Sequence, residues 1–199
     1  MNAPKTLTAD ECKLLLEALL CRNRSPYQSH RGVRNHCLAL VMLDAGLRAG
    51  EVVRLRVSDL IFNGQPVTSL VVRPEIAKNQ HERQIPISTR LCESLKEMDL
   101  FHWSPCVANS GVFAFTSGGG NKPIVRRQVH RIITRAAIRS LGRSVNPHIL
   151  RHTFATRLMR VTNIRTVQEL LGHKHISSTQ IYTHPNEQDK LDAIDRMDS

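Results

Sequence analysis

The stretch Asn146-Pro-His-Ile-Leu-Arg-His-Thr-Phe-Ala-Thr156 combines a helix start with two polar side chains at helical spacing. Asparagine followed by proline is typical of an N-cap and the first helical position, so we expect a helix over 147–160. His148 then lies in the first turn and Arg151 three residues later, on the same face. Taken alone, such a pair on a basic protein is more often a solvated helix face than a site.

Two further polar residues follow this helix. The stretch Leu170-Leu-Gly-His173 indicates the end of a helix over 164–171, with glycine as its terminator and His173 in the connection behind it. The next helix is expected over 178–184 and contains Tyr182. Guanidinium and imidazole donors suit the oxygens of a phosphodiester, and a tyrosine held nearby is a candidate nucleophile.

Upstream, an arginine follows another helix end. A helix is expected over 33–45, stopped by Gly46, and a second short helix over 49–55. Arg48 lies between them, and Glu51 three residues on can hold its guanidinium in a bidentate pair. The alternative for this fragment is an ordinary salt bridge.

A lysine lies between two segments rich in β-branched residues. Residues 67–73 and 84–87 predict two strands of a small antiparallel hairpin or sheet, around the polar segment 77–82. Lys78 in that segment is either a solubilising turn residue or a flexible donor able to deliver a proton to a leaving oxygen.

The remaining elements are mostly helices. Thr8 and Glu11 have the spacing of a capping box before a helix over 12–20, and Ser88 can cap a helix that ends at about Met98. Residues 101–120 look irregular. Helices are expected over 124–141 and 187–197. The fold class is therefore mainly α with a small antiparallel β-sheet (α+β).

The size and net charge of the chain limit the kinds of molecule that it is expected to bind. The chain has 199 residues and 22.5 kDa, which fits one domain. Lysine and arginine number 28 against 17 acids, a formal charge of +11, so a polyanion is the first partner to expect. Aromatic residues make up 4%, too few for a base-stacking platform, and duplex DNA is therefore favoured over single strands.

Five cysteines form no CxxC pair, and we expect them to be reduced core residues. The N-terminus lacks a signal-peptide core, and no apolar run reaches the length of a membrane span. The expected location is cytoplasmic, at the nucleoid, with no membrane partner and no small-molecule substrate.

Taken in order, these motifs resemble the catalytic domain of the tyrosine site-specific recombinases, the family of phage integrases, Xer-type recombinases and integron integrases. The resemblance runs from the opening helix to Tyr182. It is carried by Gly-Leu-Arg48-Ala-Gly-Glu, by Lys78 ahead of His-Glu-Arg-Gln-Ile-Pro, by His148-Ile-Leu-Arg151-His-Thr-Phe-Ala-Thr, by Leu-Gly-His173 and by Ile-Tyr182-Thr-His.

The resemblance implies a role for each residue. Arg48 and Arg151 would clamp the scissile phosphate, and His173 would donate a further hydrogen bond. Tyr182 would attack to form a 3′-phosphotyrosine, with Lys78 protonating the departing 5′-oxygen and His148 assisting proton removal from the tyrosine. No metal or cofactor is implied. The family's events are integration, excision, inversion or resolution of DNA, and the family implies self-association in a tetrameric synapse on DNA.

The chain departs from the family pattern in two ways. The lysine turn usually has glycines beside the lysine, whereas Ala77 and Asn79 flank Lys78 here. Relatives commonly carry a helical core-binding domain ahead of this one; we expect a single catalytic domain over 1–199 without it, from either a truncated chain or a short enzyme of the fimbrial-inversion type. Within it, 1–186 would form the core and 187–199 a helix that caps its own domain or is exchanged between subunits.

Three other functions compete. A metal-dependent rolling-circle-type nickase would use His173-Lys-His175 as paired ligands and leave a 5′-phosphotyrosine, although Lys174 fits that motif badly. A non-catalytic DNA-binding regulator derived from a recombinase would explain the charge equally well. A type IB topoisomerase shares the chemistry and differs in lacking strand exchange between partners.

Overall fold

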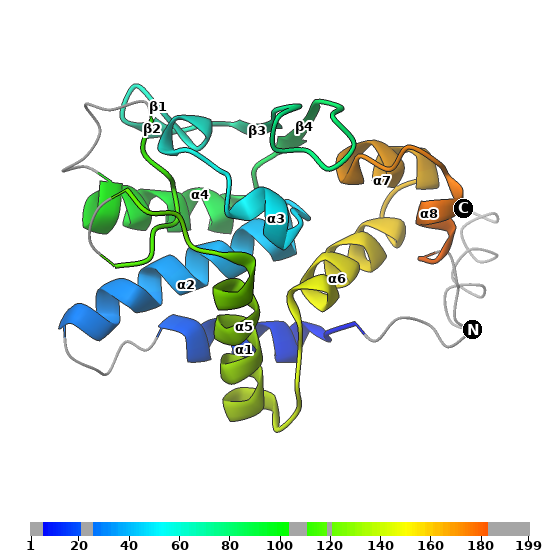
Figure 1. Cartoon of the computed structure of the whole chain (residues 1–199). Coiled ribbons are helices and arrows are strands. Elements are labelled where there is room, and N and C mark those ends of the chain that lie inside the picture. Colours follow the sequence, from blue (N-terminus) through cyan, green and yellow to red (C-terminus); the bar gives the residue numbers. More distant parts are fainter. Residues whose placement is uncertain (1–5, 21–25, 104–110, 119–120, 183–199) are drawn as a thin grey trace.

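The computed structural model describes residues 6–20, 26–103, 111–118 and 121–182. Within them the chain is mainly helical, with four short strands (Figure 1). The elements in order are α1 (Ala9–Leu20), α2 (Pro26–Asp44), α3 (Ala49–Val52), η1 (Val57–Asp59), β1 (Ile61–Phe62), β2 (Gln65–Pro66), β3 (Ser69–Val72), β4 (Arg83–Pro86), α4 (Thr89–Met98), η2 (Asp99–Trp103), α5 (Arg126–Leu141), α6 (Pro147–Met159), α7 (Ile164–Leu171) and α8 (Ser177–Gln180). The predicted α+β class is confirmed.

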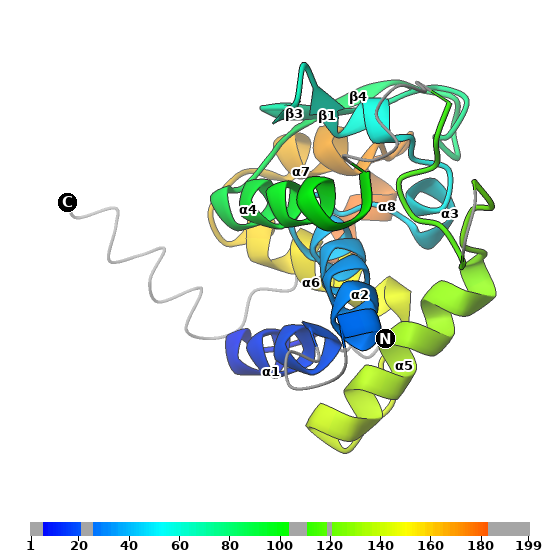
Figure 2. The same ribbon diagram turned by 90° about the vertical axis from the view of Figure 1, so that its left-hand side faces the viewer.

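Helix α2 is the centre of the packing. It contacts α1, α4 and α6, and every side chain from Cys37 to Leu43 is at most 1% exposed. A helix that is apolar on all sides belongs in a core. Helix α5 packs on α1 and stands out from one side of the molecule (Figures 1 and 2), while the strands lie together at the end opposite α1.

Local capping explains where the helices begin. Thr8 and Glu11 exchange two hydrogen bonds, the Ser88 hydroxyl accepts from the Leu91 amide, and the Asn146 side chain accepts from the first amides of α6. These three predicted caps are confirmed. Helix α2 begins at Pro26, earlier than the predicted start at 33, because proline is compatible with a first helical position.

The strands form two separate antiparallel pairs instead of the single sheet that was expected. Strands β3 and β4 pair as predicted, with Leu70 opposite Ile85. Strands β1 and β2 form a second hairpin that was not predicted, although its Asn63-Gly64 turn is typical of one: both residues have positive φ, 49° and 71°.

Several elements are shorter than expected. Helix α3 ends at Val52, not at 55, and residues 99–103 form a π-helical turn inside a segment expected to be partly irregular. Helix α8 ends at Gln180, before Tyr182. The predicted helix over 187–197 lies outside the described residues.

Among the cysteines, Cys12 and Cys37 are buried as expected and Cys92 is half-buried, while Cys21 and Cys106 fall outside the described part.

Gly46 joins α2 to α3 and brings that junction against α6. Its φ is +62°, and a Cβ there would lie 2.3 Å from Cδ1 of Phe154 on α6. Only glycine combines that backbone conformation with such an approach. The consequence is that Arg48, two residues on, starts α3 beside the helix that carries Arg151.

Candidate active site

Arg151 is a deeply buried charged group of the site. Its side chain is 2% exposed, and its guanidinium donates to the backbone carbonyls of Gly46 and Leu171, the latter at 2.8 Å. Burial, reinforced by the positive charge of Arg48, lowers the pKa of Arg151 to about 9. The group therefore remains a cation at neutral pH and is fixed in orientation by two peptide oxygens.

One carboxylate organises the arginines. Glu51 accepts hydrogen bonds from the Arg48 amide at 2.9 Å and from Nη1 of Arg48 at 3.1 Å. It also accepts from the two terminal nitrogens of Arg83, Nη1 at 3.2 Å and Nη2 at 2.7 Å. Nη1 of Arg151 lies 3.9 Å away. Burial would raise the pKa of Glu51, but the hydrogen bond and charge of Arg83 outweigh it and the pKa is lowered. The predicted Arg48–Glu51 pair is thus confirmed as part of a larger network.

Arg48 and Lys78 face a shared cavity. Arg48 caps α3, its side chain is 20% exposed, and it lines a cavity of about 790 Å³ whose other wall includes Lys78 and Arg126. Lys78 is exposed and lies in the connection between β3 and β4, where it was predicted. The cavity therefore collects positive side chains from three separate elements.

His173 follows Gly172, which ends α7 with a φ of +64°. Its Nε2 lies 3.2 Å from Nη2 of Arg151, and its Nδ1 lies 2.9 Å from Oγ1 of Thr179. Because a guanidinium can only donate, Nε2 is an acceptor in this state and Nδ1 carries the proton. Burial, followed by the charges of Arg151 and Arg48, lowers the pKa of His173 to about 4.

Tyr182 lies in the turn after α8 and is 8% exposed. Its ring is nearly parallel to that of His173, with centroids 6.4 Å apart, and its centroid is 5.3 Å from that of His152. Burial raises the pKa of the Tyr182 phenol, although Arg151 and Arg48 partly oppose this. The hydroxyl is therefore protonated at neutral pH, and a nucleophilic role requires a group that removes its proton.

His148 is, with Lys78, one of the two exposed residues among the six that were predicted. The ring it meets is that of His152, at 4.9 Å between centroids. Partial burial of the ring and the charge of Arg151 lower the pKa of His148, so the imidazole is neutral at pH 7 and able to accept a proton. His152 lies between His148 and Tyr182, and its ring contacts both.

The structure therefore places Arg48, Arg151, His173 and Tyr182 together, with Lys78 across the cavity and His148 at the edge. Three contributing residues were not predicted: Asn79, Arg83 and Thr179. For Arg83 the sequence offers an indication, because Arg83 and Ile85 are two residues apart in a strand and therefore lie on the same, inward face of β4. For Thr179 the sequence offers no indication beyond its position six residues after His173. Asn79 differs from the family pattern, but nothing in the sequence indicates its hydrogen bond to Gly172.

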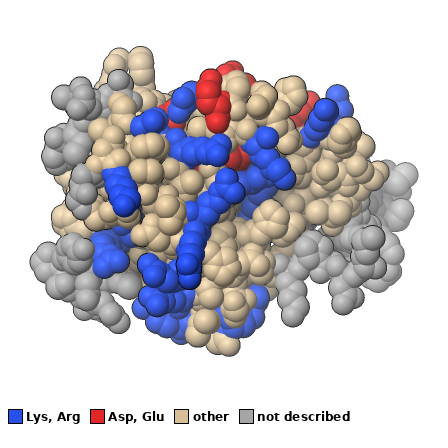
Figure 3. All heavy atoms as spheres, viewed as in Figure 1, with Lys and Arg blue, Asp and Glu red and all other residues tan. Residues whose placement is uncertain are grey.

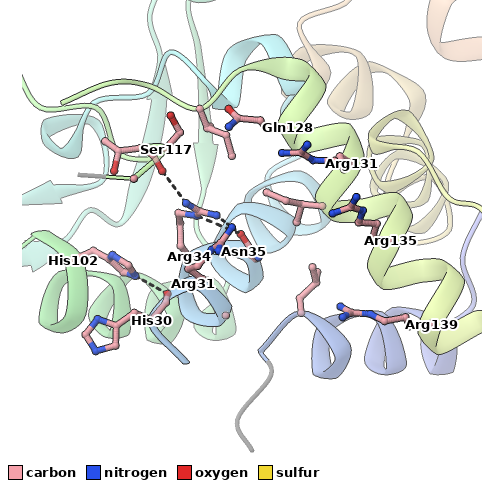
Figure 4. Close-up of a pocket in the computed structure, with 16 residues that line it drawn as sticks. His30, Arg31, Arg34, Asn35, His102, Ser117, Gln128, Arg131, Arg135 and Arg139 are labelled. Carbon is pink, nitrogen blue, oxygen red and sulfur yellow. Dashed lines mark hydrogen bonds between the residues drawn. The ribbon is translucent and has the colours of Figure 1, made fainter. Parts of the chain in front are cut away.

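A basic groove lies between α2 and α5 (Figure 4). It has a volume of about 940 Å³, and Arg131, Arg135 and Arg139 line it from successive turns of α5. Across from them, Arg34 donates to the carbonyl of Thr116 at 2.8 Å. Figure 3 shows lysines and arginines in a band over this face of the molecule.

Within the described residues, no helix is long and apolar enough to cross a membrane. The same part of the chain contains no group of three or more histidines, cysteines or acids placed to hold a metal ion.

A buried tyrosine beside an imidazole, with two arginines held by one carboxylate, defines a class of site that suits phosphodiester chemistry through a side-chain oxygen. Residues 5–189 match the model of the phage integrase family, and the chain belongs to that family.

Several known proteins that resemble the chain in sequence or in structure are recombinases. The chain is 32% identical over 197 residues to a tyrosine recombinase of Thermosipho africanus, covering 98% of this chain and 62% of that protein. Of solved structures, XerA recombinase superposes with a TM-score of 0.76 at 26% identity, covering 98% and 66% of the two chains. XerH recombinase bound to its difH substrate gives 0.74 at 24%, covering 98% and 54%. The chain spans 54–62% of the length of the first curated relatives it matches.

Proposed function

We propose that this protein is a site-specific DNA recombinase that cleaves and rejoins duplex DNA through a 3′-phosphotyrosyl intermediate. The observation that carries the proposal is the contact chain from Tyr182 to His173 to Arg151, which ends at the carboxylate shared with Arg48. Family membership and the curated relatives named as tyrosine recombinases support it.

In this mechanism Arg48 and Arg151 bind the non-bridging oxygens of the scissile phosphate. Their charge is already oriented by Glu51 and by peptide carbonyls, so little reorganisation accompanies the reaction. For His173 to add a third donor, Nε2 must carry the proton. The Thr179 hydroxyl permits this change of tautomer, because it can donate to Nδ1 as readily as it accepts.

The bond changes balance without a further reactant. Tyr182 Oη forms a bond to phosphorus while the bond from phosphorus to the 5′-oxygen breaks. The tyrosine proton passes to His148, and Lys78 supplies a proton to the leaving 5′-oxygen. Religation reverses each transfer, so the energy of the phosphodiester is kept in the phosphotyrosine and neither a metal nor a nucleotide is consumed.

The basic groove would carry the flanking duplex. Arginines spaced four residues apart lie on one face of a helix, so Arg131, Arg135 and Arg139 can follow a row of phosphates. We further propose that the chain acts as a single catalytic domain, assembles as a tetrameric synapse on DNA, and works in the cytoplasm at the nucleoid.

Covalent capture tests this proposal. The protein is mixed with fragmented genomic duplex DNA in buffer containing a chelator and denatured, and the attached DNA is purified and sequenced, with Tyr182→Phe as the matched control. Recovery of a recurrent sequence that the Phe variant does not retain would support it. Attachment that needs a divalent metal would point to the nickase, and binding without attachment to a regulator.

A further inference from the structure

The segment that carries Lys78 is attached to the end of α7 at two points. We call residues 73–82, which connect β3 to β4, the lysine loop. Nδ2 of Asn79 donates to the carbonyl of Gly172 at 3.1 Å, and Nε of Arg83, directly after the loop, donates to the carbonyl of Leu170 at 3.1 Å. Both acceptors belong to the last turn and cap of α7, immediately before His173.

Arg83 also connects this attachment to the arginine cluster. Its side chain is 5% exposed, and its two terminal nitrogens bind both oxygens of Glu51. One guanidinium therefore joins β4, α3 and α7. The planar fork allows this, because Nε and the two Nη groups donate in different directions from one rigid plane.

Gly172 permits the close approach. A Cβ at this position would lie 3.0 Å from Cδ of Arg83, and the φ of +64° favours glycine independently. The residue that ends α7 thus also leaves room for the arginine stem. Both partners therefore contribute to the contact: Arg83 donates the hydrogen bond, and Gly172 leaves room for its side chain.

Lys78 itself is held by little else. Its side chain is exposed, and no hydrogen bond or ion pair of its ammonium group is found among the described residues. A free lysine side chain samples many rotamers, so the time it spends at one leaving oxygen depends on where its backbone is held. That backbone is one residue from Asn79 and five from Arg83.

We propose that Asn79 and Arg83 are positioning residues that hold the lysine loop against the end of α7, and so keep Lys78 in register with His173 and the arginines. The inference rests on the proposed function, in which Lys78 protonates the 5′-oxygen. Neither residue touches the DNA in this account, and each acts through the placement of the lysine.

The test compares two leaving groups. The substrates are duplexes carrying the captured cleavage sequence, with either oxygen or sulfur as the bridging 5′-atom of the scissile bond. A thiolate is a far weaker base than an alkoxide and leaves without a proton donor, so a defect in proton delivery disappears on the sulfur substrate. A defect in folding, binding or nucleophilic attack persists on both.

Asn79→Gly should form the covalent complex about tenfold more slowly on the oxygen substrate, as expected for one missing hydrogen bond, and at nearly the wild-type rate on the sulfur substrate. Arg83→Lys, which keeps the charge and removes the fork, should be slower on oxygen and partly restored by sulfur. The matched control is Gln80→Gly in the same loop. Gln80 has a positive φ of 54°, so glycine is compatible with its backbone, and the variant should behave as wild type.

The variant Lys78→Ala distinguishes a failure of the proposed function from a failure of the positioning role of Asn79 and Arg83. If wild-type protein cleaves neither substrate, the proposed function is wrong and the inference falls with it. If wild type cleaves both but sulfur fails to restore Lys78→Ala, Lys78 is not the proton donor, and the inference falls while the recombinase function stands. If sulfur restores Lys78→Ala but Asn79→Gly is equally slow on both substrates, or unimpaired on oxygen, the positioning role alone is wrong.

Discussion

Nη2 of Arg151 lies 3.2 Å from Nε2 of His173, so in the DNA-free state the two groups are bonded to each other. In the proposed mechanism an arriving phosphate replaces this hydrogen bond. The Thr179 hydroxyl, fully buried on the opposite side of the imidazole, holds the ring during that exchange. In the resting site Arg151 and His173 therefore bind each other, and His173 changes its tautomer before it can donate to a phosphate.

Thr179→Val should slow covalent complex formation about tenfold, because it removes a hydrogen bond worth about 1 to 1.5 kcal/mol while keeping the side-chain shape. Thr179→Ser keeps the hydroxyl and is the control. Single-turnover cleavage rates at saturating DNA make the comparison, and equal rates for the Val variant and wild type would show that the hydroxyl does not matter.

The His173 imidazole should titrate near pH 4 in the free protein, compared with an ordinary value near 6.5. The unfolded chain then binds a proton between those values that the folded protein does not, so the free energy of unfolding should fall as the pH drops through this window and level off above about 6.5. Proton NMR, with His173→Gln to assign the resonance, measures the pKa. Titration at or above 6.5 would contradict the burial argument.

The two clamp arginines should differ in their effect on stability. Arg48→Lys is expected to reduce the cleavage rate by about 10² to 10³ with little effect on stability, since its side chain is partly exposed. Arg151→Lys should reduce the rate by a similar factor and also destabilise the fold by about 1–3 kcal/mol, because the carbonyls of Gly46 and Leu171 lose their donors. Cleavage rates and urea denaturation separate the effects. Equal stability of the two variants would argue against the structural part of Arg151.

Replacing Arg131 and Arg135 by glutamine should weaken binding to all duplexes and make the dependence of log K on log salt shallower by about 0.9 for each phosphate that is no longer neutralised. The control is a charge-matched double variant, Lys13→Gln with Lys96→Gln, because both lysines are exposed on α1 and α4 and neither lines the groove. Fluorescence anisotropy over a salt series gives both slopes. An unchanged slope in the arginine variant would remove the groove from the DNA-binding face.

Much of the architecture was predictable because it is local. Caps such as Asn146 and terminators such as Gly172 act within one turn, and they set the ends of α6 and α7 within a residue or two. The sequence predicts Tyr182 within a helix, but α8 ends before it, and the four polar residues of α8 carry little periodic signal.

The network around Glu51 was only half predictable. Its pair with Arg48 is three residues away and visible in the sequence, whereas its partner Arg83 is 32 residues away and reaches it only once β4 packs beside α3. A buried arginine in a strand is a signal for such an ion pair but does not name the acid. Hydrogen bonds from side chains to distant carbonyls, such as that of Asn79 with Gly172, leave no pattern in the sequence at all.

In the proposed reaction Tyr182 becomes joined to a 3′-phosphate of DNA. The most direct measurement is mass spectrometry of the captured complex after nuclease and protease digestion, with chemical analysis of the opposite DNA end. A nucleotide is expected on the peptide containing Tyr182, linked through its 3′-phosphate, together with a free 5′-hydroxyl on the other strand end. A 5′-phosphotyrosine, or an adduct on any other residue, would contradict it.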